Sequence, residues 1–186
     1  MGISKYLQMP NSVINSFLST KKKSKKELLK ELDLPSKKPM IGILLEGDVS
    51  ERDEMMLKTV VEALSHIDVN IVVISEKDHQ WGTIKNMRVI DYDRKKRKKL
   101  LEAADIALGL NFNDVEEMLL NGVIPVSHVR AELEDYNPNQ ESGNAFLYKG
   151  ENPWSAFAAL VRAIETYKFP YDWKNIVRDG IGSVKS

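Results

Sequence analysis

Short apolar runs recur along the chain, and each has the length of a β-strand. The first, residues 40–45, is apolar throughout, which is typical of a strand that helices cover on both faces. Similar runs predict further strands, and these span residues 69–74, 87–91, 105–110, 123–127 and 145–148.

Amphipathic segments alternate with these runs. After Asp53, apolar residues recur at Leu57, Val60, Val61 and Leu64, the spacing of one helical face. Further helices are predicted over the basic run 94–99 and the apolar residues that follow it, from about residue 114, from Pro153 and over residues 172–179. The alternation predicts a three-layer α/β/α Rossmann-like fold, with one parallel sheet of about six strands and helices on both faces.

One globular domain is expected for a chain of 186 residues. Residues 39–186 are predicted to form the Rossmann-like domain, and residues 1–38 an N-terminal segment and short helix packed on its outside. That helix starts with the basic run 21–26, and a second basic run spans residues 94–99. We interpret both runs as solvated helix faces; a phosphate-binding patch is the alternative for the first.

The composition narrows the function classes. Lys and Arg number 27, as do Asp and Glu, so no net charge attracts nucleic acid or an anionic membrane. Nucleic-acid binding through the lysine-rich runs stays a third possibility, which predicts steep salt dependence. The lack of cysteine excludes disulfides and thiolate catalysis. No apolar run approaches the roughly 20 residues that span a bilayer, and no signal-peptide core is seen, so we expect a soluble, cytoplasmic protein without a membrane partner.

The carboxyl ends of the first and fourth predicted strands form the candidate site, because ligands bind at such ends in open α/β sheets. The residues placed there, and predicted to bind a ligand, are Gly47, Asp48, Asn111 and Asn113.

A divalent cation is an alternative ligand, because hard oxygen ligands gather after the first strand. The acids concerned are Glu46, Asp48, Glu51, Asp53 and Glu54. We favour the interpretation that they complement the dipole of the following helix or are solvated. The three histidines are scattered, and no hydrolase triad, Walker loop or complete G-x-G-x-x-G occurs. No catalytic residue, cofactor or metal is therefore predicted.

Several segments, taken in order, carry a resemblance to a known family. They are KELLKELDLP (26–35), PMIG (39–42), LEAADI (101–106), NGVIPV (121–126) and WKNIVRDG (173–180). Together they resemble the C-terminal, nucleotide-sugar-binding half of bacterial glycogen synthase and plant starch synthase, glycosyltransferases with two Rossmann domains (GT-B type). The resemblance covers nearly the whole chain. It implies a nucleotide sugar or a glucan as ligand, and a separate N-terminal-type glycosyltransferase domain or another protein as partner.

The chain departs from this family where the donor diphosphate is held. The family carries an arginine after the first strand and a lysine shortly afterwards, whereas this chain has Glu46 and Glu51. At about 5 Å and an effective dielectric constant near 20, each reversal turns an attraction of about 3 kcal/mol into a similar repulsion.

Other motifs of the family are also altered. Residues 75–78 (SEKD) replace a glycine-rich turn, the loop 111–117 is shorter and lacks a P-C-G-L segment, and Ala131 and Glu132 replace paired glycines. The resemblance therefore predicts a catalytically degenerate domain that acts as a binding or scaffold module. The alternative is an active component of a glucosyltransferase that moves glucose from ADP- or UDP-glucose to an α-glucan, with a separate acceptor domain. An active site would require a cation or metal near Glu46 and Glu51.

Overall fold

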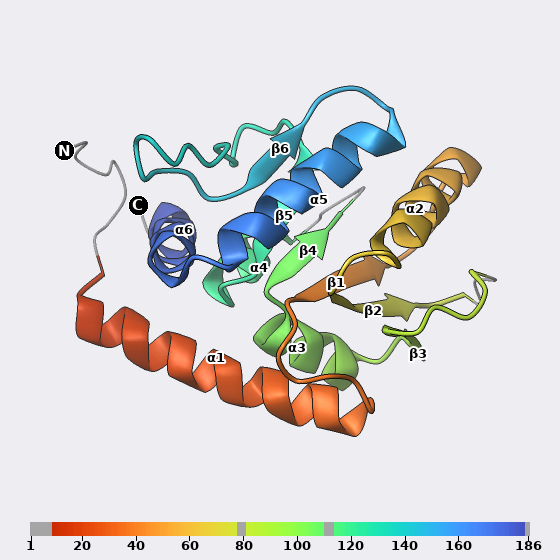
Figure 1. Ribbon diagram of the computed structural model, residues 1–186, viewed down its shortest axis with the longest axis horizontal. Coiled ribbons are helices and arrows are strands. Elements are labelled where there is room, and N and C mark those ends of the chain that lie inside the picture. Colours follow the sequence, from red (N-terminus) through yellow and green to blue (C-terminus); the bar gives the residue numbers. More distant parts are fainter. Residues whose placement is uncertain (1–8, 78–80, 110–113, 185–186) are drawn as a thin grey trace.

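The predicted three-layer α/β/α Rossmann-like fold is confirmed (Figure 1). The structure is a computed structural model and describes residues 9–77, 81–109 and 114–184. One sheet of six parallel strands has the order β3-β2-β1-β4-β5-β6. Its strands are β1 (Met40–Leu45), β2 (Asn70–Ser75), β3 (Met87–Asp91), β4 (Ile106–Leu108), β5 (Ile124–His128) and β6 (Phe146–Tyr148).

Helices cover both faces of the sheet, as Figure 1 shows. They are α1 (Asn11–Glu31), α2 (Glu51–Leu64), α3 (Arg94–Ala103), α4 (Val115–Leu120), α5 (Pro153–Tyr167) and α6 (Pro170–Val184). Successive residues of β1 point to opposite faces, so Ile41 and Ile43 pack in one core with Leu57 of α2 and Leu160 of α5. On the other face, Met40 packs in a second core with residues of α1, α3 and α4.

The N-terminal helix differs from its prediction. Instead of a short helix with a basic start, α1 has 21 residues and begins at Asn11, directly after Pro10. Its lysine run is therefore inside the helix, where Lys21 and Lys25 lie on the buried side. The interpretation of this run as a solvated face was wrong for these two lysines and correct for Lys22 and Lys23, which are exposed.

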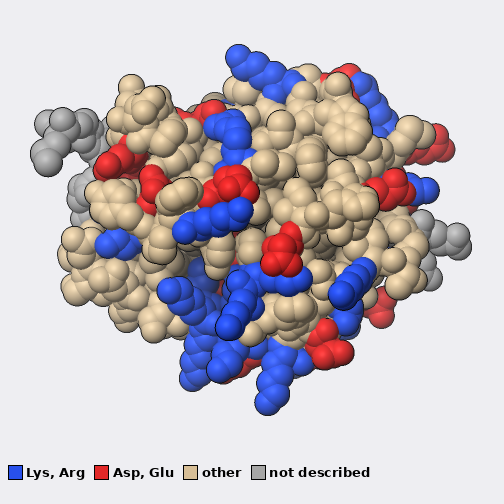
Figure 2. Space-filling model, in the orientation of Figure 1, with Lys and Arg blue, Asp and Glu red and all other residues tan. Residues whose placement is uncertain are grey.

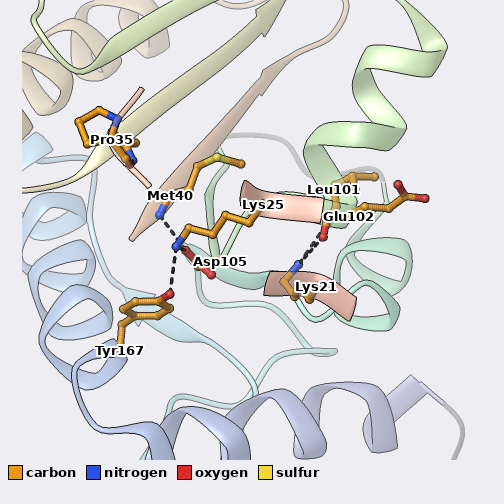
Figure 3. A network of polar contacts seen from close by, with 9 residues as sticks. Lys21, Lys25, Pro35, Met40, Leu101, Glu102, Asp105 and Tyr167 are labelled. Atoms are coloured by element: carbon orange, nitrogen blue, oxygen red, sulfur yellow. Dashed lines mark hydrogen bonds and ion pairs between the residues drawn. The ribbon is translucent and has the colours of Figure 1, made fainter. Parts of the chain in front are cut away.

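Lys21 joins α1 to the ends of two other helices, and Figure 3 shows its contact with the end of α3. Its Nζ atom donates to the carbonyl oxygens of Leu101 (3.2 Å) and Glu102 (3.4 Å) near the end of α3, and of Asn121 (2.7 Å) after α4. The cation thus satisfies carbonyl groups that have no partner within their own helices, at the negative ends of both helix dipoles.

The signals for helix ends were correct in two places and wrong in a third. Gly122 follows α4 with a φ of 64°, and the Asn152 side chain accepts the backbone N–H of Trp154 at the start of α5. The last helix, predicted to close at Gly180, continues to Val184. Gly180 instead permits close packing, because a Cβ atom there would lie 3.1 Å from Cδ2 of Leu119 on α4.

Within the described residues, no helix has both the length and the apolar character needed to cross a bilayer.

Candidate functional site

The candidate site lies where β1 and β4 are neighbours at the centre of the sheet. From β1 the chain runs outward to β2 and β3, and β4 then begins the other half, so the strand order reverses between β1 and β4. A crevice outside the carboxyl ends of the strands at such a point is the usual ligand site of an open α/β sheet. Of the four predicted ligand-binding residues, Gly47 and Asp48 follow β1 at this edge. Asn111 and Asn113 fall outside the described residues.

Gly47 and Asp48 form a turn that is tied to the turn after β2. Gly47 has a φ of 74°, a conformation that suits glycine, and its N–H donates to Oε2 of Glu76 at 3.4 Å. Oδ1 of Asp48 accepts from Nζ of Lys77 at 2.8 Å. This hydrogen bond lowers the pKa of Asp48 and raises that of Lys77. Both side chains are exposed, so the pair is weak, and Asp48 faces a lysine.

Arg97 of α3 is the central cation of this edge, and the sequence analysis did not single it out. Its Nε donates to Oε1 of Glu46 at 2.5 Å, while its two other nitrogens donate to Oδ2 of Asp114 at 2.7 Å and Oε2 of Glu117 at 2.6 Å. The Arg97 side chain is only 13% exposed. Partial burial opposes its charge, but the hydrogen bonds that it donates to Glu117 and Glu46 outweigh this effect, and the pKa of Arg97 is raised.

The interpretation of residues 94–99 as a solvated outer face was therefore wrong for Arg97. A signal for its orientation existed in the sequence. Arg97 lies three and four residues before Leu100 and Leu101, which are buried, so it shares their side of the helix. We call Arg97 and its three carboxylate partners, Glu46, Asp114 and Glu117, the Arg97 cluster. Because one guanidinium faces three carboxylates, the cluster has an excess of negative charge.

A hollow of about 390 Å³ lies beside the Arg97 cluster between α3 and α4. Arg94 and Lys98 add positive charge to its wall, and Tyr92 and Leu101 supply its less polar surface. The hollow has the size of a small-ligand site, but its polar lining consists mainly of groups that already pair with one another.

The start of α2 borders a second hollow of about 250 Å³. Oγ of Ser50 accepts the backbone N–H of Asp53 at 3.1 Å and donates to Oδ2 of the same residue at 2.7 Å. Arg52 forms an ion pair with Glu151 across this hollow. Glu51, which stands where the family has its lysine, is exposed in the first turn of α2.

His128 is one of the residues that line the second hollow, and its ring lies against that of Tyr148 on β6. His128 is at the end of β5, and its ring is tilted by 48° to that of Tyr148, with 4.3 Å between ring centroids. Burial, with a smaller contribution from Asp53, raises the pKa of Tyr148 to about 12, so its hydroxyl is protonated at neutral pH.

The acids considered as a divalent-cation site have separate partners. Glu46 pairs with Arg97, Asp48 with Lys77, and Asp53 with Ser50. Across residues 9–77, 81–109 and 114–184, no three His, Asp or Glu side chains are grouped so that they could hold a metal ion.

Comparisons with known proteins show what this domain is similar to. No protein-family model matches the sequence. A glycogen synthase from Fervidobacterium nodosum is 23% identical over 189 aligned residues, which cover 88% of this chain and 38% of the synthase. A glycosyltransferase from Rickettsia africae has a TM-score of 0.66 at 11% identity, over 95% of this chain and 48% of that protein. The UDP-GlcNAc 2-epimerase from Neisseria meningitidis, solved with UDP-GlcNAc, has a TM-score of 0.55 at 14% identity, over 94% of this chain and 51% of the epimerase.

These findings confirm the resemblance that the sequence segments carry, namely to the C-terminal domain of a GT-B glycosyltransferase of the glycogen synthase kind. The two solved structures show the fold alone. The chain spans about half or less of the proteins that it matches.

Proposed function

We propose that this chain is a glycosyltransferase-like binding or scaffold module in which the site for the donor diphosphate no longer operates. The observation that carries the proposal is the state of Arg97. Its guanidinium donates from all three of its nitrogens, to Glu46, Glu117 and Asp114, so three carboxylates already compensate its single positive charge.

The electrostatic balance supports this proposal. A diphosphate that reached Arg97 would have to displace charge-assisted hydrogen bonds, which are about twice as strong as neutral ones. Each displaced carboxylate would remain nearby and would repel the diphosphate by about 3 kcal/mol at about 5 Å and a dielectric constant near 20. Arg97 therefore compensates the acid at position 46 and does not replace the missing cation of the family.

The start of α2 supports the proposal independently. A helix N-terminus can bind an anion through its free N–H groups. Here the Ser50 side chain caps the N–H of Asp53, and Glu51, Asp53 and Glu54 place carboxylates in the first turn. These acids already interact favourably with the helix dipole, so a phosphate would meet repulsion at the same point.

An active component of a glucosyltransferase is the second candidate. The hollow beside the Arg97 cluster favours it, because Arg94 and Lys98 bring further cations to its wall. In that case the glucose of ADP- or UDP-glucose would pass to an α-glucan, and the acceptor domain would be separate from this chain, which covers 38% of the similar synthase.

Calorimetric titration with ADP-glucose and UDP-glucose, each with and without Mg²⁺, separates the two candidates. If the chain is such a module, we expect no heat of binding for either nucleotide sugar, with or without Mg²⁺. Micromolar binding that is lost in an Asp48→Ala or Glu46→Gln variant would overturn the proposal and support the enzyme.

A gain-of-function variant sharpens the test. Glu46→Arg together with Glu51→Lys restores the two cations of the family, and we expect it to bind UDP or ADP at least about tenfold more tightly than the unaltered chain. The matched control, Glu62→Arg with Glu165→Lys, makes the same change in charge at exposed positions elsewhere on α2 and α5. Equal binding by both variants would mean that net charge, and not this site, attracts the nucleotide.

A further inference from the structure

The two lysine-rich runs, far apart in the sequence, lie on neighbouring helices. α1 and α3 pack along each other, and an ion pair of 2.9 Å between Lys99 and Glu31 joins them. Figure 2 shows Lys and Arg side chains gathered over the lower part of the molecule, where Figure 1 places α1 and α3. The fold has thus combined two separate runs into one surface.

We call this surface the α1–α3 basic face. Its exposed cations are Lys22, Lys23, Lys26, Lys30, Arg94, Lys95, Lys96, Lys98 and Lys99. They outnumber the acids of the same two helices and their caps, which are Glu27, Glu31, Asp93 and Glu102. Because the whole chain carries 27 cations and 27 acids, the excess here is balanced by an excess of acids elsewhere. The neutral total therefore conceals a local excess of positive charge on this face.

These acids neutralise the face only in part. Asp93 caps α3 by accepting the backbone N–H groups of Lys95 and Lys96. Glu31 pairs with Lys99, and Glu102 lies 3.7 Å from Lys98. Within the part of the chain that the structure describes, Lys22, Lys23, Lys26, Lys30 and Lys95 form no ion pair.

We propose that the α1–α3 basic face binds the surface of an anionic membrane. Clusters of about four to eight Lys and Arg residues on a helix are typical of proteins that bind anionic lipid headgroups. Apart from Arg94, every exposed cation of the face is a lysine, a compact and strongly hydrated charge that suits the diffuse field of such headgroups. The prediction of no membrane partner rested on the balanced total charge and on the lack of a bilayer-spanning apolar run, and neither describes this local distribution.

Nucleic acid fits the same face less well. Base recognition favours the bidentate geometry of arginine, and binding to single strands uses aromatic side chains on which bases stack. Neither basic run contains an aromatic residue. The proposal goes beyond the proposed function and does not depend on it, because it rests on the exposed lysines of α1 and α3, whereas the proposed function rests on the ion pairs of Arg97 and on the start of α2.

Cosedimentation with vesicles tests the proposal. We expect the chain to bind vesicles of mixed phosphatidylserine and phosphatidylcholine at low salt, and not vesicles of phosphatidylcholine alone. Added salt should release it, because the Debye length falls from about 10 Å at 0.1 M to about 3 Å at 1 M.

Two quadruple variants with the same net charge make the test specific to the face. Replacing Lys23, Lys26, Lys95 and Lys98 with Gln should reduce the partition coefficient at least about a hundredfold. The control replaces exposed lysines outside the face, namely Lys58, Lys85, Lys149 and Lys168, with Gln and should retain binding within about threefold.

Three results would overturn the proposal. One is the absence of wild-type binding to the anionic vesicles at low salt. Another is an equal loss in both quadruple variants, which would assign binding to net charge. The third is salt-dependent binding of a DNA or RNA duplex by the wild-type chain without binding to vesicles, which would identify nucleic acid as the partner.

Discussion

Lys25 of α1 and Asp105 at the start of β4 form a buried ion pair, with 2.5 Å between Nζ and Oδ2. The same oxygen accepts the backbone N–H of Met40 at 2.8 Å, and Lys25 also donates to the hydroxyl of Tyr167 at 3.0 Å (Figure 3). Burial opposes the charge of Lys25, but Asp105 and Tyr167 outweigh it, so the pKa of Lys25 is raised. This network joins the N-terminal helix to β1, β4 and α5.

Breaking the pair on one side should be more damaging than removing both charges. Lys25→Met leaves the Asp105 carboxylate buried without a cation, and we expect the free energy of unfolding to fall by about 3–5 kcal/mol. The double variant Lys25→Met with Asp105→Asn should be more stable than Lys25→Met, because the amide oxygen can still accept from Met40 while no buried charge is left unpaired. Urea denaturation measures the free energy of unfolding of both variants. Additive losses in the double variant would contradict this account.

Lys21 should make the stability depend on pH in the alkaline range. Burial, only partly offset by Asp105 and Glu102, lowers the pKa of Lys21 from 10.5 to about 8. Between these two values the unfolded chain binds a proton that the folded chain has released, so stability rises with pH. The stability of the wild type relative to Lys21→Met should therefore increase from pH 8 to pH 10. Titrating groups common to both proteins cancel in this difference, and a flat difference would show that Lys21 stays protonated in the fold.

Gly143 should tolerate alanine far less well than Gly150. Both have a positive φ, 122° and 79° respectively. A Cβ atom at Gly143 would lie 2.6 Å from Cα of Tyr136 and 2.8 Å from the carbonyl oxygen of Asp135, both backbone atoms, whereas a Cβ at Gly150 meets nothing within 4 Å. We expect a loss of about 1 kcal/mol for Gly150→Ala from its backbone conformation, and at least about 3 kcal/mol for Gly143→Ala. Similar melting temperatures for the two variants would contradict the close approach.

The predicted boundary at residue 39 can be tested by truncation. We expect residues 39–186 alone to lack cooperative thermal unfolding, because removing α1 uncovers the surfaces that bury Ile14, Leu28 and Leu29 and leaves Asp105 unpaired. Deleting a buried Leu or Ile side chain usually costs about 2–5 kcal/mol. The combined loss from these three side chains is therefore comparable to the stability of a whole domain, about 5–15 kcal/mol.

Point variants of α1 provide the control for this truncation. Ile14→Ala should be strongly destabilising, whereas Val13→Ala, at a side chain that is 48% exposed, should change little. A truncated chain that melts cooperatively at the temperature of the full chain would show that α1 is not part of the folding unit.

The sequence by itself determined the strands, the helices that follow β1, and their order. Apolar runs and helical periodicity are local properties, and they located β1 and β3 with the bounds found in the structure, residues 40–45 and 87–91. Capping at Asn152 and the left-handed glycine at Gly122 were also predictable, because each depends on a few adjacent residues. The same reasoning placed Gly47 and Asp48 correctly at the carboxyl edge of the sheet.

Only the tertiary structure decided what the charged residues do. A lysine run has the same composition whether a given member faces water or the protein, and the packing of α1 against α3 selected Lys21 and Lys25 for burial. Arg97 is separated from Glu46 by 51 residues and from Glu117 by 20, so their contact follows from the meeting of strand and helix ends. The charges of the chain balance in number, and the fold alone gathers the cations of α1 and α3 on one face, because electrostatic interaction depends on distance in space and not along the sequence.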